Sequence, residues 1–355
     1  GGALAGLTTG AGGAIVLNSG VSNSGALTIS SAITAAGAGH VRLNALAGAI
    51  AVNAGVDAGA GSLSVLSSGG QTYGAAGDLS TTAGTVDVQA GGAITMNADT
   101  VFLTTGGNAR VTSGGAITLG VIDARKSGEQ SGWGSVSVVT SNGSILDNTG
   151  DTAINVYANA LRLSATAGVG ALGANTTNAI ETEAASLSAA AGSGVLSLAE
   201  ASALSVGEVA AVVANRVKSD GTVTASTVSD SAAQAGLTST GADGALVLVV
   251  TGALTVDSAV TAHGSGNVLL QSTGGALALN AAVISTTGHI TVVATGSITQ
   301  ADAGDITTTG AGTVDMQAGS ALTMADGAKV SAAGDVRMQA LGGDLTLGEI
   351  DAGAA

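Results

Sequence analysis

The chain has 355 residues and a formal net charge of −15, yet only 9% of its residues are charged and 1% are aromatic. It contains 58 glycines and neither proline nor cysteine. The lack of cysteine excludes a disulfide scaffold, a thiolate metal site and a cysteine nucleophile. The acidic balance argues against nucleic acid as a partner, because binding to phosphates needs a basic surface. No run of about 20 apolar residues occurs, so we expect no membrane-spanning segment.

A short phrase, Gly-Ala-aliphatic-x-aliphatic, recurs at steps of 21–24 residues from Gly25 to Gly115 and again from Gly252 to Gly343, with a further copy at Gly13. A second phrase, Gly-x-aliphatic-x-aliphatic, lies between its copies, as at Gly39, Gly61 and Gly84. The first phrase starts at Gly13, Gly25, Gly48, Gly70, Gly92 and Gly115, and again at Gly252, Gly275, Gly296, Ser320 and Gly343. A regular step of this length is typical of a repeat architecture.

Within each phrase the apolar residues lie two positions apart, as Ile94 and Met96 do. This spacing predicts a short strand with one buried face. Two or three such strands in each step, separated by glycine corners, predict an all-β fold. We expect a parallel β-solenoid of about 15 coils (rungs) of 21–24 residues, in which each coil pairs with its neighbours.

The composition agrees with this fold. Glycine at the corners supplies positive φ, and proline would break the ladder between coils. We expect a narrow core with no room for aromatic rings. Four asparagines at strand ends are interpreted as corner residues that tolerate left-handed φ and stack as amide ladders: Asn18, Asn53, Asn97 and Asn280.

The chain also repeats over a longer distance. Thr85-Val-Asp-Val-Gln-Ala-Gly matches Thr313-Val-Asp-Met-Gln-Ala-Gly at an offset of 228, and other matches lie at 227. Residues 1–124 and 231–352 are therefore two copies of one segment, and residues 125–230 are a less regular stretch that occurs once. We expect residues 1–355 to form a single continuous solenoid, cut from a longer array or stacked on its neighbours.

The single-copy stretch contains two irregular regions. Residues 125–133 leave room for a loop, because the coil step is longer there. Residues 199–217 combine helix-forming residues with two strand-like apolar runs, so irregular coil strands and a short helix both remain open.

Three segments of this stretch, Gly143-Ser-Ile-Leu-Asp-Asn, Ala160-Leu-Arg-Leu-Ser-Ala and Asn178-Ala-Ile-Glu-Thr, carry a family resemblance. Together with the Gly-Ala-Ile-Thr-Leu texture of the whole chain, they resemble the repeat region of filamentous-haemagglutinin-like exoproteins, which are giant secreted bacterial adhesins. The resemblance implies a right-handed parallel β-helix in an extracellular or cell-surface fibre. It implies no catalytic residues and no cofactor.

Few residues point to chemistry. His40 and His289 each follow a corner glycine and are interpreted as solvated, and His263 also lies near a corner. Asp147 and Asp151 form the nearest approach to a Ca²⁺-binding loop, with an acidic turn as the alternative. Asp87 and Asp315 hold equivalent places in the two copies, so we expect both to lie on the surface.

Charge and a large aromatic residue meet in one place, the loop with Arg125, Lys126, Glu129 and Trp133. An exposed Trp133 stacks on a sugar or on a partner fibre, and a buried one covers a corner of the core. These observations predict a structural shaft of a bacterial surface fibre or adhesin, not an enzyme. Its predicted partners are further copies, joined end to end or laterally, and surface glycans. The alternatives are a polysaccharide-active β-helix enzyme and an ice- or mineral-binding solenoid, which needs a regular threonine array.

Overall fold

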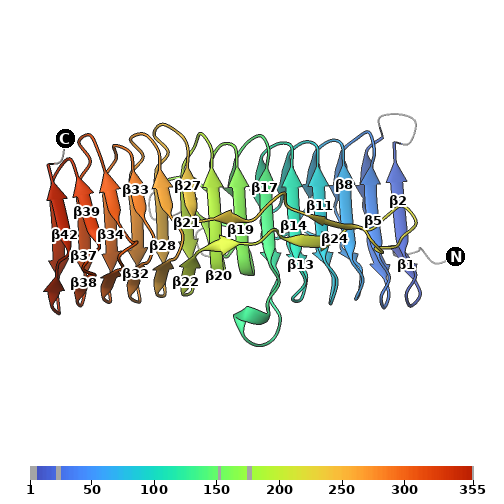
Figure 1. The fold of residues 1–355 in the computed structure, drawn as a ribbon. Helices are drawn as coiled ribbons and strands as arrows, with labels where there is room; N and C mark the ends of the chain where they lie inside the picture. Colours follow the sequence, from blue (N-terminus) through green and yellow to red (C-terminus); the bar gives the residue numbers. More distant parts are fainter. Residues whose placement is uncertain (1–5, 21–24, 151–152, 174–177, 354–355) are drawn as a thin grey trace. The chain divides into compact units, whose positions relative to one another are not determined.

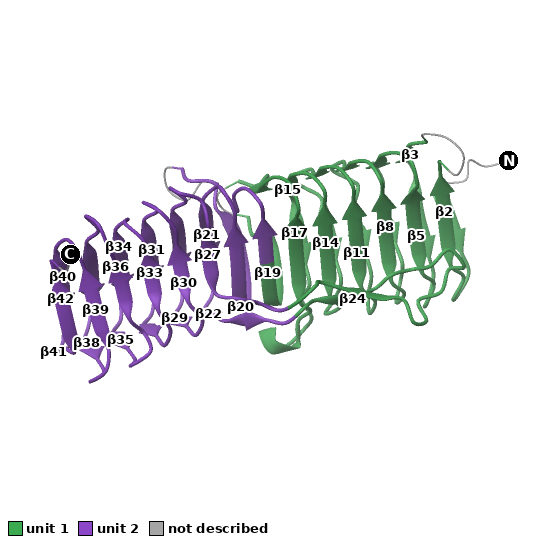
Figure 2. Cartoon of the chain, turned by 45° about the horizontal axis from the view of Figure 1, so that its top comes forward, with its two compact units in different colours: residues 1–162, 211–232 green, residues 163–210, 233–355 purple. Residues whose placement is uncertain are grey.

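A computed structural model describes residues 6–20, 25–150, 153–173 and 178–353. Their regular elements are strands joined by turns and loops, apart from one short 3₁₀ helix at Gln130–Gly132 (Figure 1). Parallel strands stack coil upon coil, which confirms the predicted β-solenoid of about 15 coils. The chain divides into two compact units (Figure 2): unit 1 is Gly1–Arg162 with Ala211–Ala232, and unit 2 is Leu163–Ala210 with Ala233–Ala355.

Each regular coil contributes three strands, which we assign to rows A, B and C. In unit 1, row A holds β2 (Ile15–Ser19), β5 (Val41–Ala45), β8 (Leu63–Ser67), β11 (Val86–Ala90), β14 (Ala109–Ser113) and β17 (Val136–Thr140). Row B holds β3 (Leu27–Ile29), β6 (Ile50–Val52), β9 (Gln71–Tyr73), β12 (Ile94–Met96), β15 (Ile117–Leu119) and β18 (Ile145–Asp147). Row C holds β1 (Gly6–Thr9), β4 (Ala32–Ala35), β7 (Val56–Asp57), β10 (Leu79–Ser80), β13 (Val101–Leu103), β16 (Val121–Asp123) and the start of β19 (Val156–Ala165).

Unit 2 repeats these rows. Row A holds β21 (Leu196–Glu200), β28 (Leu246–Val250), β31 (Val268–Ser272), β34 (Ile290–Ala294), β37 (Val314–Ala318) and β40 (Val336–Ala340). Row B holds β22 (Leu204–Val206), β29 (Leu254–Val256), β32 (Leu277–Leu279), β35 (Ile298–Gln300), β38 (Leu322–Met324) and β41 (Leu345–Thr346). Row C holds β27 (Leu237–Ser239), β30 (Val260–Ala262), β33 (Val283–Ser285), β36 (Ile306–Thr308), β39 (Lys329–Ala332) and β42 (Glu349–Ala352). The long β20 (Ile180–Ala191) pairs in turn with β21, β22 and β27.

The register between coils explains the repeat. Val41 pairs with Leu63, and Leu63 with Val86, so like residues stack directly on one another. The phrases from Gly25 to Gly115 and from Gly252 to Gly343 lead into row B. The phrase at Gly13 does not, because β2 pairs with β5 in row A. Rows A and B share the same glycine and alternating apolar pattern, so the residue pattern alone did not separate them.

Most corner glycines are needed for close approach and not for positive φ. A Cβ atom built on Gly61 would lie 1.9 Å from the carbonyl oxygen of Gly39, and one on Gly84 would lie 2.0 Å from that of Gly61. The same stacking continues at Gly107 and Gly134. Any larger residue would therefore separate two coils at this corner.

Polar side chains beside this corner bridge successive coils. Asn108 Oδ1 accepts a hydrogen bond from the Ser135 N–H at 2.9 Å, and Asn267 Oδ1 accepts one from the His289 N–H at 2.8 Å. Asn18 and Asn44 form one amide contact of the expected kind, at 3.1 Å. The expected left-handed conformation of the asparagines is wrong, because Thr105 and Ala225 are the non-glycine residues with positive φ in the described part of the chain.

The core consists mainly of Val, Leu, Ile and Ala, but it also admits aromatic rings, contrary to our expectation. Tyr73 and Phe102 are both buried in unit 1, with ring centroids 4.8 Å apart in an edge-to-face arrangement. The Tyr73 hydroxyl donates to Gln71 Oε1 at 2.6 Å, and burial raises the pKa of Tyr73 well above its ordinary value. A buried hydroxyl with its own acceptor is compatible with this interior.

Beyond Val206, the second irregular region of the sequence leaves the coil. Within unit 2, β23 (Glu208–Val209) pairs antiparallel with β26 (Gln234–Ala235). Within unit 1, β24 (Val213–Asn215) pairs antiparallel with β25 (Thr227–Ser229). We call Ala211–Ala232 the hairpin. Of the two readings left open for residues 199–217, the helix is wrong and strands are present, but those beyond Val206 are not coil strands.

Candidate functional site

The hairpin lies across the outer face of row A in unit 1 (Figures 1 and 2). This face is formed by the second residue of each A strand, which lie in one register: Val16, Arg42, Ser64, Asp87, Arg110 and Ser137. Three hairpin side chains, Val212, Ala214 and Val217, are buried. We call this surface the covered face.

Backbone groups of the hairpin bind side chains of the coil. The Val217 N–H donates to Ser64 Oγ at 2.9 Å, and the Val217 carbonyl accepts from Arg42 Nη1 at 2.5 Å. The Asn215 N–H donates to Thr85 Oγ1 at 2.8 Å. Burial is the main cause that lowers the pKa of Arg42. A strand that crosses other strands cannot pair with them along its backbone. These bonds give partners to backbone groups of β24 and of Val217 just beyond it.

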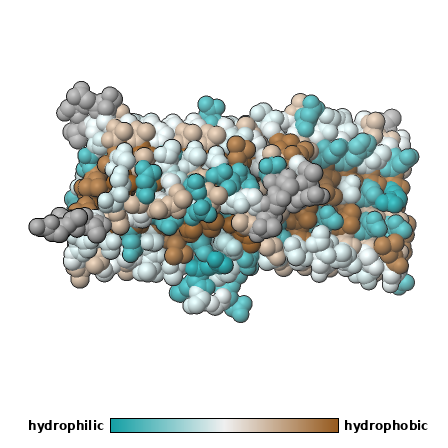
Figure 3. Space-filling model, turned by 180° about the vertical axis from the view of Figure 1, so that it is seen from behind, coloured by the Kyte–Doolittle hydropathy of each residue, from teal (hydrophilic) through white to brown (hydrophobic). Residues whose placement is uncertain are grey.

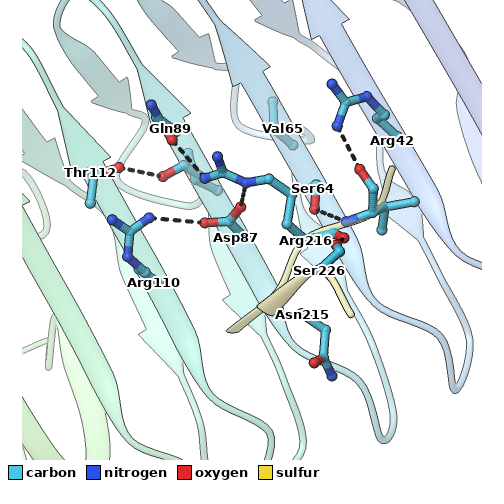
Figure 4. A network of polar contacts seen from close by, with 12 residues as sticks. Arg42, Ser64, Val65, Asp87, Gln89, Arg110, Thr112, Asn215, Arg216 and Ser226 are labelled. Carbon is cyan, nitrogen blue, oxygen red and sulfur yellow. Dashed lines mark hydrogen bonds and ion pairs between the residues drawn. The ribbon is translucent and has the colours of Figure 1, made fainter. Parts of the chain in front are cut away.

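Asp87 is the centre of a polar network beneath the hairpin (Figure 4). Its side chain is 0% exposed and accepts from Arg216 Nε of the hairpin at 2.6 Å and from Arg110 Nη1 at 3.2 Å. The second guanidinium arm, Arg216 Nη2, donates to Gln89 Oε1 at 2.6 Å. The expectation that Asp87 lies on the surface is therefore wrong, because the hairpin covers it.

A second carboxylate faces the opposite way, from the hairpin to the coil. Asp230 lies 3.5 Å from Arg110 Nε and 3.3 Å from Arg162 Nη1, and it also accepts from the Val212 N–H at 3.2 Å. Its residue is 7% exposed. The hairpin thus supplies an arginine to a carboxylate of the coil and a carboxylate to arginines of the coil. Buried pairs of this kind specify one position of the bound segment.

The predicted glycan loop is held to its own coil and to the following coil through Arg125. The guanidinium group of Arg125 pairs with Asp123 at 2.6 Å and lies 3.7 Å from the centroid of the Tyr157 ring. The stem of Lys126 packs over Gly106, and Glu129 is exposed. This loop appears as a mainly hydrophilic projection in Figure 3.

Trp133 is half-buried, between the two arrangements that the sequence left open. Its Nε1 atom is buried and has no hydrogen-bond partner among the described residues.

The calcium prediction rests on one described residue, since Asp151 lies outside the described residues. Asp147 accepts from the Thr149 N–H at 2.7 Å, from Asn155 Nδ2 at 2.8 Å and from the Gly150 N–H at 3.1 Å. Burial alone would raise the pKa of Asp147, but these hydrogen bonds lower it. The carboxylate is therefore used to close a turn, and no group of three or more His, Cys, Asp or Glu residues gathers elsewhere in the described ranges.

The histidines belong to the coil-bridging positions. His40 Nδ1 accepts from the Ser62 N–H at 2.9 Å, and burial lowers the pKa of His40. His289 Nδ1 lies 2.8 Å from Thr313 Oγ1. His263 and His289 are exposed, as expected for His289, whereas His40 is half-buried.

Glu200 of unit 2 is a buried acid that the sequence analysis missed. It is 2% exposed and takes the last position of β21. Thr182 Oγ1 donates to it at 2.7 Å, Ser202 Oγ at 2.7 Å and the Ala184 N–H at 3.0 Å. Burial raises the pKa of Glu200 to about 7, although these hydrogen bonds act in the opposite direction.

The sequence analysis also missed the hairpin and its network, although two signals were present. Asp220-Gly221 lies between two runs rich in β-branched residues, a pattern typical of a hairpin turn, and Gly221 has a φ of 79°. Arg216 is one of only nine basic residues, and it lies far from any coil phrase.

Comparisons with models of protein families, with curated proteins and with solved structures found no match for this chain. No helix in the described part of the chain has the length and apolar character needed to cross a bilayer.

Proposed function

We propose that this chain is a structural shaft segment of a bacterial extracellular fibre or adhesin of the filamentous-haemagglutinin-like kind. One observation carries the proposal: the polar groups on the outside of the coils bind neighbouring coils. Asn267 binds the backbone of His289, His289 binds Thr313, and Asp315 pairs with Arg337 at 2.6 Å. Polar groups used between coils stabilise a stack, whereas an enzyme needs them to converge on a substrate.

Electron microscopy of the purified chain tests this function. A shaft predicts elongated particles that join end to end or side by side as the protein concentration rises. Compact, rounded particles at every concentration would contradict it.

The glycan partner is tested through Trp133, the only tryptophan of the chain. Intrinsic fluorescence of the chain, titrated with surface oligosaccharides, should change if the sugar stacks on this ring. Replacing Glu129, which is exposed in the same loop, should weaken binding as well, whereas Lys329→Ala serves as the distant control. Fluorescence that does not respond to any glycan would remove this partner from the proposal.

Ice or mineral binding is a second candidate, because one row carries threonines in register. Thr299, Thr323 and Thr346 follow one another on row B of unit 2. In row B of unit 1, Thr72 and Thr95 lie in the same register, but Ala51 interrupts the row of threonines. These residues line a shallow groove of about 270 Å³. A measurement of thermal hysteresis separates the candidates, since a shaft has no effect on ice growth.

A further inference from the structure

The second copy of the repeated segment carries a face that corresponds to the covered face. It is formed by the second residue of each A strand from β28 to β40, with Gln317 beside it, and all of these residues are partly or fully exposed; Ser197 of β21 is buried and is not included. We call it the open face; its residues are Val247, Leu269, Thr291, Asp315, Gln317 and Arg337.

The groups that hold Arg216 on the covered face recur on the open face. Asp315 and Gln317 lie on β37, two residues apart, as Asp87 and Gln89 do on β11. Asp315 faces Arg337 of the next coil, just as Asp87 faces Arg110. Asp315 is 33% exposed where Asp87 is 0% exposed. An anchoring carboxylate with its neighbouring amide is thus present in unit 2, where the Asp315 oxygens accept from Arg337 at 2.8 and 2.6 Å in place of the hairpin guanidinium group of unit 1.

The second anchor of the hairpin also has a counterpart. Arg110 faces Asp230 of the hairpin on the covered face, and Arg337 holds the same register position on the open face. The side chain of Arg337 is 59% exposed, against 14% for Arg110. A hairpin with the charges of Arg216 and Asp230 therefore meets opposite charges at both points.

The open face is also suited to the apolar side of the hairpin. Val247, Leu269 and Val293 are half-buried on the outside of row A in unit 2. Leu269 holds the position of Arg42, next to the place where Val217 is buried in unit 1. Leu269 offers apolar contact to the hairpin at this position, but it supplies no donor for the Val217 carbonyl that Arg42 binds in unit 1.

We propose that the open face of unit 2 binds the Ala211–Ala232 hairpin of a second copy of this chain. The hairpin leaves its own covered face to do so, and one set of contacts replaces another. Since the hairpin takes a site other than the one it leaves, its own covered face becomes exposed, and binding between copies increases with protein concentration. This contact goes beyond the proposed shaft function, since it joins copies whatever the assembled chain does.

Cysteine cross-linking tests the proposal, because the chain has no native cysteine. A tagged Val217→Cys chain is mixed with an untagged Thr291→Cys chain, oxidised, and analysed by mass spectrometry. Thr291 takes the register position of Ser64, which contacts Val217 on the covered face. We expect at least three times more cross-linked heterodimer than with Thr323→Cys, an exposed residue of row B. Equal yields would overturn the proposal.

The anchor is tested by adding Asp315→Asn to the Thr291→Cys chain. The heterodimer yield should fall at least threefold, because Arg216 loses its carboxylate, whereas Asp351→Asn in row C should leave the yield unchanged. A yield that does not respond to Asp315→Asn would show that the hairpin is not held as proposed. The double variant Ser64→Cys with Val217→Cys verifies that the hairpin is still folded, by forming its link within one chain.

Sedimentation of the cysteine-free chain provides a measurement that no introduced thiol can disturb. We expect association that increases with concentration in the natural sequence and that is at least threefold weaker in Asp315→Asn. A monomer at all concentrations would contradict the proposal.

Discussion

The covered face of unit 1 and the open face of unit 2 share an aspartate and an arginine in the same register and differ in what lies over them. Asp87 and Asp315 both pair with an arginine of the next coil, Arg110 and Arg337. Asp87 is nevertheless fully buried, and Asp315 is one-third exposed. In a solenoid, the environment of an outer residue is therefore decided by the segment that crosses the coil and not by the coil sequence.

The interiors of the two copies differ in another way. Gln71 and Tyr73 fill one strand of row B in unit 1, and Ile298 and Gln300 hold the corresponding places in unit 2. The hydroxyl of Tyr73 binds Gln71, whereas Gln300 donates to the carbonyl of Lys329 at 3.0 Å. Gln300 thus keeps a partner for its amide nitrogen, whereas its Oε1 atom is buried without a hydrogen-bond partner among the described residues.

The largest effect should come from a charge placed in either core. Met96 and Met324 occupy the same position in the two copies, with 0% and 3% exposure. Replacing either of them, or Ile117, with Asp should lower the free energy of unfolding by more than about 4 kcal/mol, because the carboxylate is buried without a partner. Denaturant titrations followed by circular dichroism measure this loss.

The matched control is Thr95→Asp, since Thr95 is exposed on the same strand as Met96. It should change the unfolding free energy by less than about 1 kcal/mol. Equal losses at Thr95 and Met96 would contradict the assignment of the strand faces.

The second largest effect should distinguish the two faces. Asp87→Asn leaves Arg216 and Arg110 without their shared carboxylate beneath the hairpin, and breaking a buried ion pair costs about 3 kcal/mol or more. Asp315→Asn, an exposed pair, should cost less than about 1 kcal/mol. Thermal unfolding of the two variants under one condition makes the comparison. Similar losses would mean that the hairpin does not set the difference between the copies.

The solenoid was predictable because its signal is repeated. Each strand such as Ile94–Met96 shows the two-residue alternation, and each coil repeats it one step later. The hairpin occurs once, so no repeat marks it, and the burial of Asp87 depends on a segment 129 residues away in sequence. Duplication even misled us there, since a position shared by both copies was taken to have a shared environment.

The candidate site loop shows a similar division. Its charged and aromatic residues were found from the sequence, because Trp133 and Arg125 stand out in a chain so poor in both kinds. Their arrangement could not be predicted from the sequence, because Arg125 stacks on Tyr157, a residue of the following coil. Glu200 was also missed. The last residue of an A strand is usually small or carries a hydroxyl group, as at Ser113 and Ser272, so the pattern did not predict a buried acid there.

This acid gives unit 2 a dependence on pH. The folded pKa of about 7 lies above the ordinary value of 4.5, so the folded state binds the proton more tightly than the unfolded state does. The stabilisation is complete below pH 4.5 and is lost as the pH rises through about 7, up to a loss of about 3 kcal/mol. Unfolding curves between pH 5 and pH 8 measure it, because the folded pKa of about 7 lies within this range.

Glu200→Gln is the control, because the amide is neutral throughout. The pH dependence of stability in this range should become flatter in this variant by the amount that Glu200 contributes. An unchanged slope would mean that the hydrogen bonds from Thr182 and Ser202 hold the folded carboxylate near its ordinary pKa.

The smallest effect should come from the exposed arginine of the open face. Arg337→Ala removes the pair with Asp315, whose two side chains are 59% and 33% exposed, and should lower the unfolding free energy only slightly, because water already reaches both groups. High salt should produce a similar loss in the natural sequence and none in the variant, because screening acts on a pair that water already reaches. Arg110→Ala is the matched variant on the covered face, where Arg110 serves both Asp87 and Asp230, and its loss should be several times larger and nearly independent of salt. If salt moved the two variants equally, the hairpin would not exclude water from the pairs beneath it, and the distinction between the covered and the open face would fail.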